Sequence, residues 1–93
     1  MQTALIVVDM QNAFCHPEGS FRKRGYNIIN LEKVIETNKK LINYFHDKNL
    51  PVIYTRLVFK PDYSDAGLLL IKHPQIKQLN AYIRDSFDNE IFK

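Results

Sequence analysis

The sequence predicts an α/β protein that begins with a strand, a helix and a second strand. Two short runs rich in branched apolar residues, 4–8 and 51–58, are typical of strands in a parallel sheet. Between them, residues 31–48 repeat apolar side chains at intervals of three and four, the period of a helix packed on one face. A strand, a helix and a strand in this order form a crossover that is almost always right-handed, so the two strands are expected to be parallel.

The first strand is expected to place a carboxylate at its end. The continuous apolar run 4–8 predicts a strand that is buried on both faces, and Asp9 follows where this run stops. Ligands of open α/β sheets bind outside the carboxyl ends of the strands, so Asp9 is a candidate catalytic acid. The alternative is that Asp9 only caps a turn by accepting hydrogen bonds from backbone N–H groups.

A long loop and a well-delimited helix are predicted next. Residues 12–27 contain Pro17, Gly19 and Gly25 among polar side chains, which favours a loop that leaves the carboxyl end of the sheet. Asn30 is a favourable N-cap residue for the helix over 31–48. The end of this helix is indicated by Lys48, Asn49 and then Pro51. Its apolar stripe is expected to be core and comprises Leu31, Val34, Ile35, Leu41, Ile42 and Phe45.

The chain beyond the second strand is expected to return to the same edge of the sheet. Residues 59–66 predict a second loop, and both loops would face one crevice. Apolar residues in 68–71 and 76–83 indicate one or two short helices divided by Pro74, which completes a β-α-β-α order. Two parallel strands alone leave faces and edges of a sheet uncovered. We therefore expect residues 1–93 to be the N-terminal portion of a single domain.

Composition and charge exclude several partners. The chain is 45% hydrophobic with a net charge of +3, and its basic residues are scattered, which argues against a nucleic-acid partner. The triplet Arg22–Lys23–Arg24 has two interpretations, an anion-binding site or solvated loop charge. No apolar run approaches the roughly 20 residues needed to cross a bilayer, so no membrane partner is expected.

The single cysteine and the histidines limit the expected redox and metal chemistry. Cys15 has no intrachain disulfide partner and no secretion signal precedes it, which favours a reducing cytoplasmic location. Neighbouring residues of an extended loop point to opposite sides, so His16 is poorly placed to activate Cys15 as a nucleophile. We interpret Cys15 as a small loop hydrophobe. Since His16, His46 and His73 show no ligand spacing, no metal and no cofactor is expected.

Three segments taken together are similar to a known family. They are a strand ending in Asp-x-Gln, the aromatic loop after it, and the start of the second strand: Ala4–Asn12, Phe14–Phe21 and Val52–Arg56. In this order they resemble the isochorismatase-like cysteine hydrolase superfamily. The loop 61–67 is similar to that of the branch which holds N-carbamoylsarcosine amidase and ureidoacrylate amidohydrolase.

This resemblance implies a three-layer, doubly wound parallel sheet, of which the chain supplies the first β-α-β-α part. It further implies that an Asp, a Lys and a Cys act together on amide, carbamoyl or related bonds, with Asp9 as the general base. Gln11 would orient the Asp9 carboxylate or a substrate carbonyl. The Lys-bearing strand and the Cys turn of the family are expected beyond Lys93, because residues 85–91 are similar to the stretch that precedes that strand.

Further residues are candidates for contacts with a substrate. Arg56, at the end of the second strand, would pair with a substrate carboxylate, or alternatively form an ion pair with Asp62 or Asp65. Phe14 and Tyr63 would wall an apolar pocket, or alternatively pin the long loops to the core.

The functional hypothesis is a hydrolase that cleaves a C–N bond in a small amide, carbamoyl or ureido substrate. With the Lys and Cys outside these 93 residues, the chain alone is expected to be inactive. The alternative is a noncatalytic module that binds a small molecule or pairs with another chain through its open sheet edge. The resemblance also implies a homo-oligomer, or pairing with the missing C-terminal half.

Overall fold

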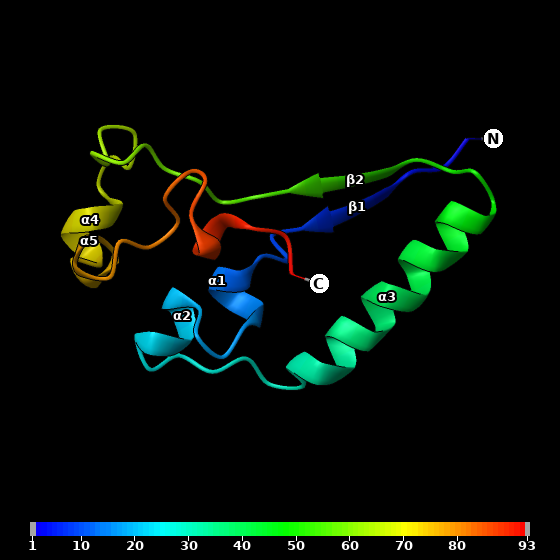
Figure 1. Cartoon of the computed structure of the whole chain (residues 1–93), viewed down its shortest axis with the longest axis horizontal. Helices are drawn as coiled ribbons and strands as arrows, with labels where there is room; N and C mark the ends of the chain where they lie inside the picture. Colours follow the sequence, from blue (N-terminus) through cyan, green and yellow to red (C-terminus); the bar gives the residue numbers. More distant parts are fainter. Residues whose placement is uncertain (1, 93) are drawn as a thin grey trace.

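The fold is α/β, and its two strands are parallel as predicted. The computed structural model describes residues 2–92. Strands β1 (Leu5–Val8) and β2 (Val52–Thr55) form a two-stranded parallel sheet, and the long helix α3 (Leu31–Asp47) connects them (Figure 1). The register aligns Leu5 with Val52 and Val8 with Thr55, so both strands end at the same edge.

One face of the sheet is covered and the other is open. Helix α3 lies on one side of the strands, where Val7 and Tyr54 line a small cavity together with Ile35. On the opposite face Ile6 and Val8 are 58% and 63% exposed. The prediction that the first strand is buried on both faces is therefore wrong, because no element within residues 2–92 covers the second face.

Helix α3 begins and ends where the sequence predicts, but without a side-chain cap at its start. Asn49 adopts a left-handed conformation with φ 57°, and Leu50 N–H donates to the Phe45 carbonyl at 2.8 Å, which closes the last turn. At the other end, Asn30 is the N-cap residue as predicted, but it is also left-handed and its side chain makes no capping hydrogen bond. The predicted core stripe is only partly covered: no residue of α3 is buried, and Val34 and Leu41 are exposed.

The predicted loop 12–27 is not simply a loop. It contains two short helices, α1 (Asn12–Cys15) and α2 (Ser20–Lys23). Gly19 permits their close approach, because a Cβ atom at this position would overlap the backbone carbonyl of Asn12. The period rule missed these helices because each spans only about one turn.

The C-terminal third folds into short helices that pack beyond the ends of the strands. They are α4 (Leu69–Lys72), α5 (Gln75–Gln78) and the 3₁₀ helix η1 (Phe87–Asn89), and Pro74 separates the first two as predicted. Between them, Ile83 forms a parallel bridge with Phe59. Within residues 2–92, no helix combines the length and apolarity needed to cross a bilayer.

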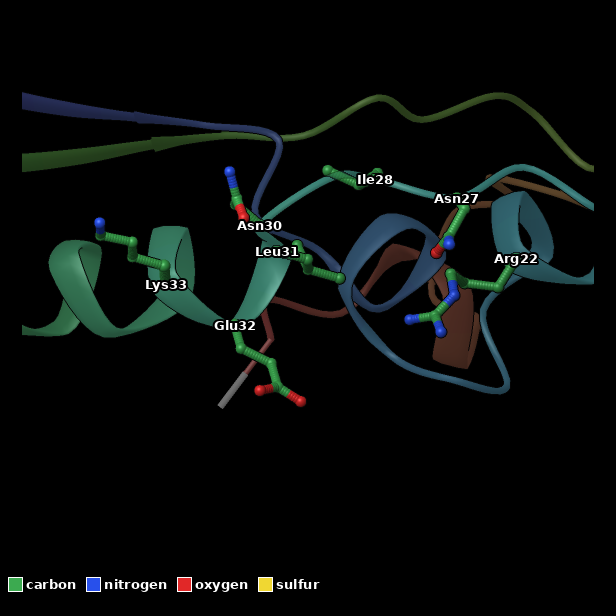
Figure 2. Close-up of a pocket in the computed structure, with 7 residues that line it drawn as sticks. All are labelled: Arg22, Asn27, Ile28, Asn30, Leu31, Glu32 and Lys33. Atoms are coloured by element: carbon green, nitrogen blue, oxygen red, sulfur yellow. The ribbon is translucent and has the colours of Figure 1, made fainter.

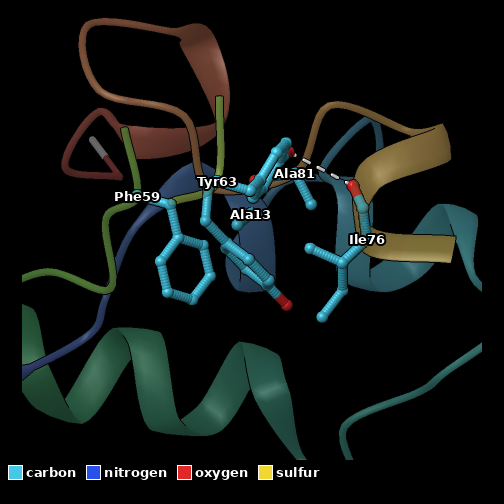
Figure 3. Close-up of a cluster of buried hydrophobic side chains, with 6 residues drawn as sticks. Ala13, Phe59, Tyr63, Ile76 and Ala81 are labelled. Atoms are coloured by element: carbon cyan, nitrogen blue, oxygen red, sulfur yellow. Dashed lines mark hydrogen bonds between the residues drawn. The ribbon is translucent and has the colours of Figure 1, made fainter. Parts of the chain in front are cut away.

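The main core lies between α1 and these C-terminal segments rather than under the sheet (Figure 3). Its buried members are Ala13, Phe59, Tyr63, Ile76, Ala81 and Tyr82. Tyr63 fixes the second loop to this core, since its hydroxyl donates to the carbonyls of Ala81 at 2.7 Å and Ile76 at 3.3 Å.

A buried carboxylate joins α2 to the C-terminal segment. Asp88 accepts hydrogen bonds from the backbone N–H and the hydroxyl of Ser20, at 2.8 and 2.6 Å, and from the backbone N–H of Tyr82 at 2.7 Å. Charge-assisted bonds of this kind are among the stronger ones in proteins. Asp88 thereby holds segments that are 68 residues apart in the sequence.

We predict that D88N destabilises the chain by about 3 kcal/mol, because the amide group turns an acceptor into a donor that faces buried donors. Urea unfolding followed by circular dichroism measures this change. The control is D85N at the neighbouring exposed position, where we expect a change below about 0.5 kcal/mol. Equal destabilisation by the two variants would contradict the role of Asp88.

Candidate functional site

Asp9 lies at the carboxyl edge of the sheet and is held there by the second strand. Its backbone has φ 56°, a left-handed conformation that Asp tolerates better than most residues. The Asp9 N–H donates to the carbonyl and hydroxyl oxygens of Thr55, at 3.2 and 3.1 Å. The Thr55 hydroxyl in turn donates to Asp9 Oδ1 at 2.8 Å. The carboxylate is thus fixed by a side chain of β2, and not by the backbone N–H groups that the turn-capping alternative requires.

The next polar residue continues the strand pairing with its side chain. Gln11 is completely buried, and its Oε1 accepts from Leu57 N–H at 2.7 Å while its Nε2 donates to the Leu57 carbonyl at 3.0 Å. The same Nε2 lies 3.3 Å from the carbonyl of Asp88. These two bonds replace the backbone hydrogen bonds that a neighbouring strand would make with Leu57, because the backbone of β1 turns away from β2 at Asp9. Gln11 therefore ties the main chain that follows Asp9 to Leu57 and Asp88 instead of contacting the carboxylate.

Arg56 lies in the chain between Thr55, which bonds Asp9, and Leu57, which bonds Gln11. It is exposed, and no carboxylate within residues 2–92 forms an ion pair with it. The two candidate partners are used otherwise: Asp62 accepts from Ser64 N–H, and Asp65 accepts from Lys60 N–H, each at 3.0 Å. The hydrogen bond from Ser64 lowers the pKa of Asp62. The predicted alternative of an ion pair is not formed.

Phe14 and Tyr63 lie in and around the core. Tyr63 is buried and burial raises its pKa, and its hydroxyl is bonded as described above, which favours its role in pinning the loop. Phe14 is half-buried and stacks on Tyr82 with ring centroids 5.4 Å apart. It also lines a cavity of about 330 Å³ whose wall includes Arg24. The structure thus brings Asp9, Gln11 and Arg56 to one edge and places Phe14 and Tyr63 on the core side.

Cys15 and His16 do not form a nucleophile and base pair. Cys15 is 4% exposed, its sulfur lies 3.9 Å from the sulfur of Met10, and burial raises the pKa of its thiol. His16 Nδ1 accepts a hydrogen bond from Glu18 N–H at 3.0 Å instead. No group of three or more His, Cys, Asp or Glu residues in the described part of the chain is arranged to hold a metal ion.

A cavity of about 420 Å³ lies between α2 and the start of α3 (Figure 2). It is lined by the polar and charged side chains of Arg22, Asn27, Asn30, Glu32 and Lys33 together with Ile28 and Leu31. None of these is a thiol or a hydroxyl, so this cavity offers no nucleophile, and its one carboxylate is the exposed Glu32.

Two important positions were not identified from the sequence. Thr55 was interpreted only as part of a strand, because the second strand was predicted to run to residue 58, whereas the observed register pairs Thr55 with Val8, next to Asp9. Arg24 belongs to the basic triplet, but nothing in its neighbourhood in the sequence indicates that its guanidinium lies among aromatic rings from distant segments.

We predict that the thiol of Cys15 in the folded chain reacts slowly with iodoacetamide and reaches half of its maximal rate at a higher pH than in the unfolded chain, because burial raises its pKa. Mass spectrometry of samples quenched over a pH series measures this rate. Urea-unfolded chain is the control and is expected to titrate near pH 8.5. A thiolate titrating below pH 8 in the folded chain would show an activated cysteine instead.

Comparison with known proteins agrees with this geometry. The Isochorismatase domain matches residues 3–89. The ureidoacrylate amidohydrolase RutB of Acinetobacter baylyi is 36% identical over 66 residues, which cover 71% of this chain and 27% of the relative. The same enzyme of Caulobacter segnis is 35% identical over 65 residues, covering 70% and 27%, and that of Cronobacter sakazakii is 32% identical over 66 residues, covering 71% and 28%.

The chain thus spans about 27% of the length of the curated relatives that it matches. No solved structure matches it. The β-α-β order, the acid at the end of the first strand and the match over residues 3–89 lead to one conclusion: the chain belongs to the isochorismatase family.

Proposed function

We propose that this chain supplies the acid-bearing part of a hydrolase that cleaves a C–N bond, with Asp9 as the general base. The observation that supports this most directly is the fixed position of the Asp9 carboxylate at the carboxyl edge of the sheet, 2.8 Å from the Thr55 hydroxyl. A base that is held in one orientation before the substrate binds needs no reorganisation during the reaction.

In the proposed reaction a cysteine and a lysine complete the site. Neither the Lys-bearing strand nor the Gly-Val and Cys turn of the family occurs within these 93 residues. Asp9 accepts the thiol proton while the sulfur forms a bond to the carbonyl carbon of the substrate. The protonated acid then gives this proton to the leaving nitrogen as the C–N bond breaks, and water hydrolyses the thioester. The lysine stabilises the negative charge on the carbonyl oxygen.

The proposed substrates are small amide, carbamoyl or ureido compounds, since the matched relatives are ureidoacrylate amidohydrolases. We assign Arg56 to a carboxylate of such a substrate, because it directly follows Thr55 in the chain, is exposed and has no ion-pair partner among residues 2–92. We do not assign Phe14 to this substrate, because it stacks on Tyr82 on the core side and lines a cavity that Asp9 does not reach. We assign Gln11 and Tyr63 to positioning the main chain rather than to contact with the substrate.

The open sheet face is the proposed surface for the rest of the fold. Ile6, Val8 and Ile53 are exposed side by side on this face, and burying such side chains contributes about 25 cal/mol per Å². We propose that its occupant is polypeptide that carries the remaining strands and helices of an isochorismatase domain. Whether that polypeptide follows in the same reading frame or is a separate chain also distinguishes the hydrolase from the noncatalytic alternative.

A chimera tests the role of Asp9. In it, this chain replaces the matching N-terminal part of the Acinetobacter baylyi ureidoacrylate amidohydrolase, and ammonia release from ureidoacrylate is measured. We expect the chimera to be active and D9N to lower kcat by about 10³-fold, since general-base catalysis contributes on this order. D47N at the exposed end of α3 is the control and should leave kcat unchanged. An active D9N chimera would contradict the proposal, as would turnover by the 93-residue chain alone that survives C15A.

The same chimera tests Thr55 as the residue that positions Asp9. We predict that T55V lowers kcat by about 10-fold with little change in KM, because the carboxylate loses its hydrogen bond while the substrate contacts remain. T55S retains the hydroxyl and should restore most of kcat. Equal activity of T55V and wild type would show that this hydrogen bond does not position the base.

A further inference from the structure

We propose that the cavity between α2 and the pair α4 and α5 binds a small, flat, monoanionic carboxylate, with Arg24 as its charged contact. This cavity has a volume of about 330 Å³, and Asp9 does not line it. The proposal is therefore independent of the hydrolase chemistry described above, and each can fail without the other.

The guanidinium of Arg24 is surrounded by aromatic rings. Its central carbon lies 5.1 Å from the centroid of Tyr26, 5.5 Å from that of Phe21 and 5.9 Å from that of Tyr82. One of its terminal nitrogens donates to the Tyr82 hydroxyl at 2.9 Å. These contacts come from both α2 and the C-terminal segment, and they hold the guanidinium in one place.

The charge of this guanidinium is not balanced. No carboxylate within residues 2–92 forms an ion pair with Arg24, and its Nε is buried without a hydrogen-bond partner. A buried donor that has lost its water costs free energy unless an acceptor replaces it. An anionic ligand with two coplanar oxygens is the natural acceptor, because a carboxylate matches the fork of a guanidinium.

The remaining wall selects for a flat, apolar body. Phe14, Leu57, Leu69 and Ile76 contribute to it together with the exposed His73, and the volume lies at the lower end of the range typical of small-molecule sites. Aromatic rings favour stacking with a planar group. One guanidinium balances one negative charge, so a carboxylate fits this apolar cavity better than a phosphate dianion, which would bring a second charge without a partner.

Arg24 thereby gives a specific role to one member of the basic triplet. The other two members do not line this cavity. The Lys23 ammonium lies 4.0 Å from the carboxylate of the exposed Glu18. Arg22 lines the polar cavity shown in Figure 2. Of the two interpretations of the triplet, anion binding applies to Arg24 and solvated charge to Lys23.

The test is a titration of the 93-residue chain with benzoate, observed by nuclear magnetic resonance, with benzamide as the neutral probe of the same shape. We expect benzoate to bind at least 10-fold more tightly than benzamide and to shift the signals of the residues that line the cavity. R24Q should weaken benzoate binding at least 10-fold, and R24K, which keeps the charge without the fork, should have intermediate affinity. R22Q on the same helix is the matched control and should bind as wild type does.

Two further variants keep the result interpretable. L69F fills the cavity but retains Arg24, and it should also abolish benzoate binding. This variant tests the cavity even if R24Q does not fold. D9N should bind benzoate normally, so a failure of the hydrolase proposal leaves this one untouched. Equal affinities for benzoate and benzamide, or wild-type affinity in folded R24Q or L69F, would overturn the proposal.

Discussion

The side-chain amide of Gln11 holds together the end of β1, the continuation of β2 and the C-terminal segment. The backbone of β1 leaves the ladder at Asp9, where a left-handed residue turns the chain away. Without a substitute, the N–H of Leu57 would lose its partner at this point, and its carbonyl would keep only the 3.3 Å hydrogen bond from Asn89 Nδ2. The amide of Gln11 provides both a donor and an acceptor at the required spacing, so the pairing continues for one more step.

This constraint explains how so small a sheet fixes the position of Asp9. Asp9 lies between the last backbone pair of the ladder, formed with Thr55, and the side-chain pair formed with Leu57. Its carboxylate is therefore at the edge of the sheet while its main chain is fixed on both sides. The apolar core contributes from beyond the sheet, because Phe59, Tyr63 and Tyr82 pack around α1 and not under the strands.

The elements with strong periodic patterns were predictable, and those set by long-range contacts were not. The two strands, the long helix and its end at Asn49 follow from hydrophobic period and local propensity, and the structure confirms them. The helices α1 and α2 could not be recognised, because a single turn carries no periodic signal and depends on distant bonds such as that from Ser20 to Asp88. Burial of the first strand was overestimated for a related reason: an apolar run indicates which faces avoid water, but not which segment covers them.

The same distinction applies to the site. Asp9 was identified because its position follows directly from the end of an apolar run, whereas the bonding of Gln11 depends on the register between strands separated by 46 residues. Arg24 shows the limit more clearly, since its surroundings come from Tyr82, 58 residues away. Residues of this kind become visible only when the tertiary contacts are known.

The most direct test of this account is amide hydrogen exchange at Leu57, whose N–H has the side chain of Gln11 as its partner. If Gln11 extends the ladder, the Leu57 amide exchanges about as slowly as the amides within β2, and in folded Q11A it exchanges at least 10-fold faster while β2 remains protected. A Leu57 amide that exchanges at the rate of an unstructured chain in the wild type, or equally slowly in both proteins, would contradict the claim that Gln11 fixes the main chain around Asp9.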